Sequence, residues 1–419
     1  MKKPIDRRSF LKIGAVTGIA SGLPLNGTIA SDSETASSLS QAADSLSNPP
    51  RIEQYVRLGR TELKISDISF GSSQLNPGEE HLVEHALARG VNYFDTAESY
   101  SKQQSEIVLG NALKGRRDQV YIATKMHAGD LTNQRAMMQS LEESLTRLQT
   151  DHVEIFFNHA VNDISRLQNE EWFEFAAKAK AQGKISYTGI SGHAGNLVEC
   201  CDYALDNDLV DVLLLGHNFG QDPSFYERFV KSFDWVANQP ELPRIMAKAK
   251  TKDVGVIAMK VLRGARLNDM RVFEKDGATY SQAAFKWALS NDNVDATIIS
   301  MTSKDKIDEF VSASGERQVS DADFKLLEQY ARNTDMTYCR HACNDCEGAC
   351  PYNVPIADVL RTRMYATDYG NLEFAQTEYA ALEESANACL SCDGAPCRDA
   401  CTHGINIAQL CGPTHLMLS

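Results

Sequence analysis

The feature that most constrains the fold is a regular alternation of strand-like and helix-like patterns between residues 54 and 334. Short apolar runs rich in β-branched and aromatic residues lie at 65–71, 91–97, 119–125, 152–159, 185–191, 210–218, 255–262 and 296–301. Amphipathic helical patterns separate them, the clearest at 133–148. Continuously apolar runs predict parallel strands buried on both faces. Eight such repeats predict a closed (β/α)8 barrel, the TIM-barrel form of the α/β class.

Two segments lie outside this regular alternation. A hairpin pattern at 55–66 comes first, and a long polar segment at 219–243 follows the sixth strand. Because loops after the strands build the active face of such a barrel, we interpret 219–243 as a lid or docking loop. The net charge of −14 argues against nucleic acid or an anionic membrane surface as a partner.

Polar residues stand where three neighbouring strands end. The second strand ends in FDTAESY, which contains Asp95 and Tyr100; the third ends at Lys125 and the fourth at His159. The carboxyl ends of barrel strands meet on one face, so these side chains are expected to share a pocket. Tyr100 would protonate a carbonyl oxygen as hydride reaches the carbon, and a nearby Lys125 would lower the pKa of that phenol. Asp95 would hold Lys125, and His159 would orient the carbonyl. The alternative is an Asp–Lys ion pair beside an unrelated Tyr and His.

The four residues resemble the Asp-Tyr-Lys-His tetrad of the aldo/keto reductase family, and the barrel keeps the family's order. The resemblance implies an oxidoreductase that transfers hydride between NADP(H) and a carbonyl or alcohol. It implies that Ser191 meets the nicotinamide amide and that Lys306 pairs with the 2′-phosphate. The residues implied to bind the cofactor are Ser191, Asn218, Lys260, Ser300, Thr302, Ser303, Lys306 and Glu309.

Two places depart from the family pattern. Members often have Gln and Tyr before the Asn that follows strand six, and the Tyr stacks on nicotinamide; here Gly216 and His217 stand before Asn218. Phe310 stands where the family often has an Asn at the adenine. An imidazole can still stack, with a smaller face, so His217 is the candidate for that contact.

The chain has eleven cysteines, and eight of them form two groups near the C-terminus. CRHACNDCEGACP and CLSCDGAPCRDAC nearly reproduce the ferredoxin run Cys-x2-Cys-x2-Cys-x3-Cys, which predicts two 4Fe-4S clusters in a helical ferredoxin-like domain. By the ferredoxin pattern one set is Cys339, Cys343, Cys346 and Cys401, and the other is Cys389, Cys392, Cys397 and Cys350. Structural zinc and disulfides are the alternatives. Cys200 and Cys201 are expected in a helix core, and Cys411 has no partner in the motif.

The N-terminus resembles a twin-arginine export signal. Arg7 and Arg8 precede Phe-Leu-Lys, an apolar run at 13–25 and small residues at 28–31. The run is too short to span a bilayer permanently. Iron–sulfur clusters are assembled in the cytoplasm, so their carrier would be exported folded, and we expect a periplasmic protein. The predicted divisions are signal peptide 1–30, flexible linker 31–52, barrel 53–335 and ferredoxin-like domain 336–419.

Three functions fit these features. The first is an exported aldo/keto reductase whose clusters serve as an electron relay, with a possible redox partner protein, or as structural staples. The second is an electron-transfer protein whose barrel is a scaffold and does not turn over nicotinamide. The third is a binding protein with zinc in the tail. A subgroup of aldo/keto reductases with a C-terminal ferredoxin-like domain resembles the whole layout, which favours the first. The substrate is not evident from the sequence.

Overall fold

The computed structural model describes residues 49–419, except for 194–195, 220–240, 263–269, 276, 335–338, 340–344, 368–371 and 403. The predicted signal peptide, most of the predicted linker, most of the 219–243 segment and Cys343 therefore lie outside the described residues.

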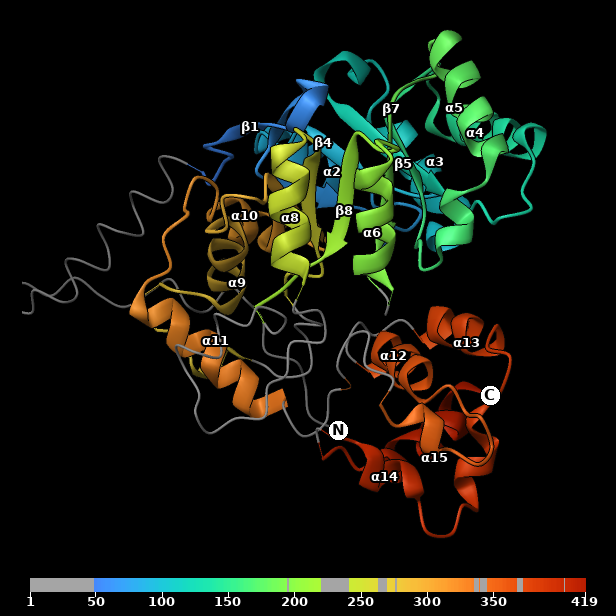
Figure 1. Cartoon of the computed structure of the whole chain (residues 1–419). Coiled ribbons are helices and arrows are strands. Elements are labelled where there is room, and N and C mark those ends of the chain that lie inside the picture. The colour runs from blue at the N-terminus through green and yellow to red at the C-terminus, as the bar shows by residue number, and fades with distance from the viewer. Residues whose placement is uncertain are drawn as a thin grey trace, which may run out of the picture. The chain divides into compact units, whose positions relative to one another are not determined.

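Parallel strands close into one barrel, as the sequence predicted (Figure 1). In order around the barrel they are β3 (Ile68–Gly71), β4 (Tyr93–Asp95), β5 (Tyr121–Met126), β6 (Val153–Asn158), β7 (Ile185–Gly192), β8 (Val212–Gly216), β9 (Gly255–Met259) and β10 (Ala296–Ser300). The last strand, β10, pairs with β3 and closes the ring.

One predicted strand forms two strands in the structure. The run 65–71 divides at Asp67 into β2 (Lys64–Ser66) and β3. The Asp67 carboxylate accepts hydrogen bonds from Ser314 Oγ at 2.6 Å and from Gly315 N at 2.8 Å. These bonds tie the turn between the two strands to residues 314–315, which lie beyond β10 in the sequence.

Helices surround the barrel. They are α2 (Glu80–Ala88), α3 (Gln104–Ala112), α4 (Gln134–Leu148), α5 (Glu170–Ala181), α6 (Leu197–Asp206), α8 (Leu242–Thr251), α9 (Tyr280–Leu289), α10 (Lys304–Val311) and α11 (Asp321–Thr334). The predicted helix at 133–148 is α4. Asn133 caps it by accepting a hydrogen bond from Ala136 N at 2.9 Å, and Met137, Leu141 and Leu148 bury its apolar face.

Strand residues alternate between two apolar cores. In β8, Val212 and Leu214 belong to the cluster inside the barrel, whereas Leu213 and Leu215 belong to the cluster under the helices. Successive side chains of a strand point to opposite faces, so this alternation identifies which residues near each strand end face the barrel mouth.

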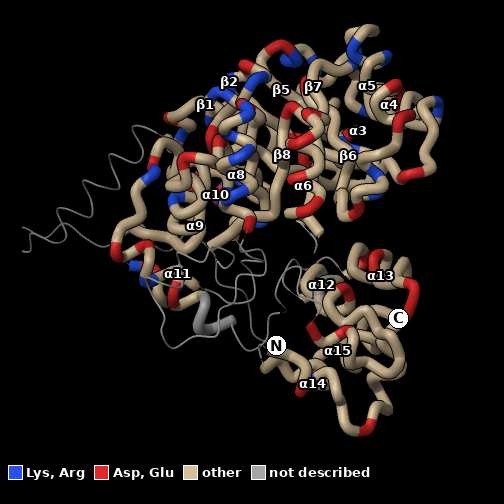
Figure 2. Tube along the Cα trace, viewed as in Figure 1, with Lys and Arg blue, Asp and Glu red and all other residues tan. Residues whose placement is uncertain are grey.

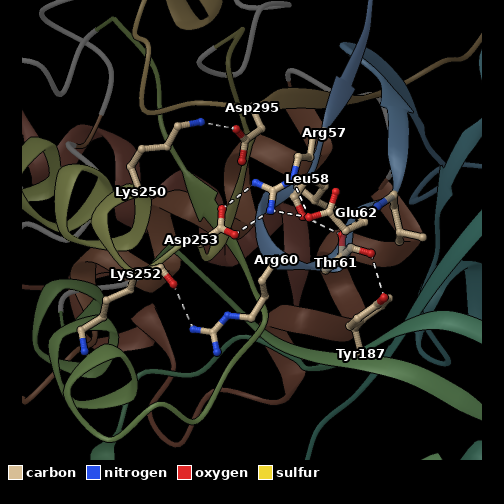
Figure 3. Close-up of polar contacts among 11 residues, drawn as sticks. Arg57, Leu58, Arg60, Thr61, Glu62, Tyr187, Lys250, Lys252, Asp253 and Asp295 are labelled. Atoms are coloured by element: carbon tan, nitrogen blue, oxygen red, sulfur yellow. Dashed lines mark hydrogen bonds and ion pairs between the residues drawn. The ribbon is translucent and has the colours of Figure 1, made fainter.

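A hairpin closes the amino end of the barrel. β1 (Tyr55–Arg57) pairs with β2, and the 3-10 turn η1 (Gly59–Thr61) lies between them. The Arg57 guanidinium donates to both carboxylate oxygens of Asp253, at 2.7 and 2.6 Å, and to Glu62 (Figure 3). Asp253 lies two residues before the start of β9, and Leu58 packs in the interior core. The hairpin therefore closes the amino end of the barrel. A functional site is accordingly expected at the other end, where the strands have their carboxyl ends.

The tail is helical, as predicted, and has an apolar core of its own. Its helices are α12 (Ile356–Thr367), α13 (Leu372–Ala380), α14 (Pro396–Ala400) and α15 (Ile407–Leu418), with 3-10 turns η6 (Glu347–Ala349) and η7 (Ala386–Leu390). Tyr379 joins three of these elements, because its hydroxyl lies 2.8 Å from His415 Nδ1 and accepts from Ala386 N at 2.7 Å.

Surface charge is mixed. Lys and Arg positions are interspersed with Asp and Glu over the barrel (Figure 2). Within the described part of the chain, no helix combines the length and apolar composition needed to cross a membrane.

Candidate active site

A buried ion pair lies at the carboxyl end of β4 and β5. Lys125 Nζ is 2.5 Å from Asp95 Oδ1 and 2.6 Å from the carbonyl oxygen of Thr96. Both side chains are almost fully buried, and both occupy inward positions that follow Tyr93 and Ala123 of the interior core. Burial raises the pKa of Asp95 and lowers the pKa of Lys125, while their contact draws each back toward its charged form.

Tyr100 joins this pair from the loop after β4. Its hydroxyl is 3.5 Å from Lys125 Nζ, and the same ammonium lies 4.8 Å from the centre of its ring. Directly after it, Ser101, Lys102 and Gln103 all have positive φ, between 47° and 72°. A run of left-handed non-glycine residues is strained backbone of the kind that collects at functional sites.

The pKa of Tyr100 is raised in the unliganded protein, not lowered as the sequence analysis predicted. Burial, followed by the charge of Asp95, raises the pKa of Tyr100 well above that of a free phenol. Lys125 is drawn toward Asp95 and Thr96, which are closer to it than the Tyr100 hydroxyl. Tyr100 is therefore protonated at neutral pH and is a proton donor in the unliganded protein.

His159 completes the group from the end of β6. Its ring meets that of Tyr100 edge-on, with centroids 5.6 Å apart at 80°. Burial first, and then the positive charge of Lys125, hold the pKa of His159 well below its usual value, so the imidazole is neutral. The four residues predicted at three strand ends thus lie together.

Arg166 lies in the 3-10 turn η4 (Ile164–Leu167) and supports the backbone around His159. The sequence analysis did not identify it. Its guanidinium donates at 2.8 Å to three backbone carbonyl oxygens, those of Ala128, His159 and Ala160, and at 2.5 Å to Asn158 Oδ1. It thereby joins the loops after β5 and β6 and fixes the backbone that carries His159. No short motif marks such a clamp, because three of these acceptors are backbone atoms.

The residues implied to bind the cofactor lie on the strands and loops from β7 to α10. Ser191 is buried on β7, and its Oγ accepts from Ala160 N at 3.0 Å. Asn218 follows β8, and Lys260 follows β9 with a φ of 61°. Ser300 ends β10, with its Oγ 2.7 Å from Ser73 Oγ.

The segment after β10 holds the other four. Thr302 precedes α10, and Ser303 caps that helix by accepting from Lys306 N at 3.2 Å. Lys306 Nζ lies 2.6 Å from Glu309 Oε2. Hydroxyls and one half-exposed ammonium at a helix start have the donor chemistry that a nucleotide phosphate requires, so these residues fit NADP(H).

The suggestion that His217 stacks on nicotinamide was wrong. The alternation in β8 turns it outward, and its ring lies 5.0 Å from that of Trp287 on α9. The inward positions here are Gly216 and Asn218. Phe310 is buried, with its ring 5.3 Å from that of Phe285 and 5.8 Å from Lys306 Nζ.

The tail brings one predicted cysteine set together. Cys350, Cys389, Cys392 and Cys397 line a single pocket with Tyr352. Four thiols are the donor set of a 4Fe-4S cluster, so these residues fit one. No three His, Cys, Asp or Glu side chains among the described residues form a ready metal site, however, and the set with Cys343 is incompletely described. The clusters therefore stay a prediction.

The three cysteines outside the two predicted sets are buried. Cys200 and Cys201 pack in the core on α6, as expected. Cys411, which the motif left without a partner, hydrogen-bonds Cys389, and this bond lowers the pKa of the Cys389 thiol to about 7.

Comparison with known proteins points to the same protein family as the geometry of the site. Residues 67–275 match the model of the aldo/keto reductase family. L-galactose dehydrogenase of Arabidopsis thaliana is 27% identical and aligns over 65% of this chain and 91% of its own length. L-glyceraldehyde 3-phosphate reductase of Escherichia coli is 23% identical over 70% and 96% of the two chains. The structure of an aldo/keto reductase from Klebsiella pneumoniae in complex with NADP and acetate, 24% identical, covers 67% of this chain and 95% of its own, with a TM-score of 0.51.

A parallel barrel with a Lys–Asp pair, a tyrosine and a histidine at the carboxyl ends of its strands defines a barrel oxidoreductase. The barrel of this chain belongs to the aldo/keto reductase family.

Proposed function

We propose that the protein transfers hydride between NADP(H) and a carbonyl or alcohol substrate, with Tyr100 as the proton donor. The observation that carries this proposal is that Tyr100 contacts both neighbours: its hydroxyl lies 3.5 Å from the buried Lys125 ammonium, and its ring lies 5.6 Å from the ring of His159. Relatives named as a dehydrogenase and a reductase, and a neighbour bound to NADP, support the same reaction class.

Each residue of the group has a defined task in carbonyl reduction. NADPH, when bound, supplies the hydride that adds to the carbonyl carbon. Tyr100 gives its proton to the carbonyl oxygen, and the resulting phenolate is stabilised by Lys125 until solvent returns a proton. Neutral His159 donates a hydrogen bond that orients the carbonyl, and Asp95 keeps Lys125 charged. Ser191 and Asn218 would hold the nicotinamide amide, and Lys306 the 2′-phosphate.

The test is Tyr100→Phe, which keeps the ring and removes the proton. We expect NADPH-dependent turnover of a panel of aldehydes and ketones to fall by a factor of about 10² or more, as for loss of a general acid. NADPH affinity, measured by quenching of protein fluorescence, should not change. Undiminished turnover in the variant would refute the role of Tyr100.

We also propose that Cys350, Cys389, Cys392 and Cys397 hold a 4Fe-4S cluster, and that Cys339, Cys343, Cys346 and Cys401 hold a second. The shared pocket of the first set and the ferredoxin spacing of both support this. Such clusters supply one-electron transfer. Iron and sulfide analysis of anaerobically purified protein should give eight of each per chain, as two such clusters require, whereas zinc without sulfide would exclude them.

Export through the twin-arginine pathway to the periplasm is proposed from Arg7 and Arg8. Replacing both arginines by lysine should leave the protein in the cytoplasmic fraction, and unchanged periplasmic recovery would contradict this.

A second candidate is an electron-transfer protein whose barrel does not turn over nicotinamide. The outward turn of His217 favours it, because this ring is then not at the mouth to stack on nicotinamide. Bleaching of cluster absorption by NADPH under anaerobic conditions would support a relay enzyme. Bleaching by dithionite but not by NADPH would favour an electron-transfer protein whose barrel serves only as a scaffold.

A further inference from the structure

Histidines occupy the same place on four neighbouring strands. His127, His159, His193 and His217 each directly follow the last residue of β5, β6, β7 and β8. His217 turns outward to Trp287. His127, in contrast, is two residues beyond Lys125 on the inward side of β5, and the proposed mechanism does not use it.

His127 and His159 form a stacked pair. Their ring centroids are 4.5 Å apart and the planes are inclined by 28°. The His159 ring also meets the ring of Tyr100 edge-on, with centroids 5.6 Å apart. His159 is therefore held between two rings that come from the ends of the two preceding strands.

The hydrogen bond that usually orients a catalytic histidine is not made among the described residues. Such a ring is ordinarily oriented by a hydrogen bond from its second nitrogen to a carboxylate or carbonyl. Nδ1 of His159 is buried and has no hydrogen-bond partner among the described residues. Arg166 fixes only the backbone of His159, through its carbonyl oxygen. Another contact must fix the ring.

We propose that His127 is a positioning residue, whose ring stacks on His159 and sets its orientation in place of that hydrogen bond. The stack covers one face of His159, excludes water from the buried Nδ1, and leaves the other nitrogen to donate to substrate. Only the expected kinetic effect of His127 rests on the proposed function; its effect on the orientation of the His159 ring does not.

The test compares His127→Leu, which removes the aromatic face, with His127→Phe, which keeps it. The first readout is the rate at which diethyl pyrocarbonate acylates His159, followed by mass spectrometry of its peptide. Loss of an aromatic pair of this geometry should speed acylation about three- to tenfold in His127→Leu. His127→Phe should remain within about twofold of the wild type. His152, at the opposite end of β6, is the matched control, and His152→Ala should leave the rate at His159 unchanged.

The second readout is steady-state kinetics. His127→Leu should lower kcat about three- to tenfold without changing NADPH affinity, and His127→Phe should restore it. Equal acylation rates in His127→Leu and the wild type, in protein with wild-type circular dichroism, would overturn the proposal. So would a His127→Phe variant that behaves like His127→Leu. If the wild type reduces no carbonyl, the proposed function fails, and the acylation rates still decide whether the stack holds His159.

Discussion

Replacing Lys125 by Met tests the energetics of the buried pair. The substitution leaves the Asp95 carboxylate inside the barrel, where Oδ2 already has no hydrogen-bond partner among the described residues and Oδ1 loses its 2.5 Å contact. Removing one partner of a buried pair costs about 3–5 kcal/mol. With a urea m-value of about 3 kcal/mol/M, the barrel's unfolding midpoint should fall by about 1–1.7 M.

The loss of stability in the Lys125→Met variant should depend on pH, and it should grow as the pH rises. Without the ammonium, burial alone acts on Asp95 and raises its folded-state pKa further. The folded variant then keeps a proton that the unfolded chain releases near pH 4, so its stability falls as pH rises through the folded pKa. The deficit relative to the wild type should be smaller at pH 5 than at pH 8.

Urea unfolding followed by tryptophan fluorescence measures both effects. Lys180→Met is the matched control, because Lys180 pairs with Asp211 at 3.1 Å on the surface and should cost less than about 1 kcal/mol. Asp95→Asn combined with Lys125→Met should recover much of the loss, since no charge is then left buried. A Lys125→Met midpoint equal to that of Lys180→Met, or a deficit that grows toward low pH, would refute the reasoning.

Four further outcomes are expected. Lys306→Ala should weaken NADPH binding about tenfold or more while sparing NADH, because a charge-assisted contact to phosphate is worth about 1.5–3 kcal/mol; equal losses in a fluorescence titration would contradict this. Arg57→Leu should lower the thermal midpoint at low salt, and the difference should shrink in 1 M NaCl, where the Debye length is about 3 Å. Hydrogen bonding to Arg244 lowers the pKa of Asp202 to about 2, so Asp202→Asn should be less stable than the wild type at pH 6, with the gap closing as pH falls toward 2. Gly189→Ala should cost about 1–3 kcal/mol in urea unfolding, because its Cβ would lie 2.5 Å from Phe157 Cε1 inside the barrel.

Much of the barrel could be predicted from the sequence, because strands buried on both faces leave continuous apolar runs. The same geometry brought Asp95, Lys125 and His159 together, since each stands at the carboxyl end of a strand. The split at Asp67 was missed because a single polar residue in an apolar run gives no local sign of the turn it stabilises.

Side-chain direction was harder to predict than position. His217 was assigned by family correspondence, although the alternation of Leu214, Gly216 and Asn218 already places it on the outer face. The same alternation from Lys125 would have identified His127. Arg166 could not be found in this way, because its carbonyl partners come from two loops that only the closed barrel brings together.

The most direct test of the central claim is the fate of the hydride. NADPH deuterated at the transferring position of C4 would be incubated with the full chain and a carbonyl substrate, and the alcohol analysed by mass spectrometry. The account predicts one deuterium on the former carbonyl carbon with the wild type and greatly reduced labelled product with Tyr100→Phe. Alcohol formed without deuterium would mean that the barrel does not pass hydride from NADPH to the carbonyl, and would contradict the account.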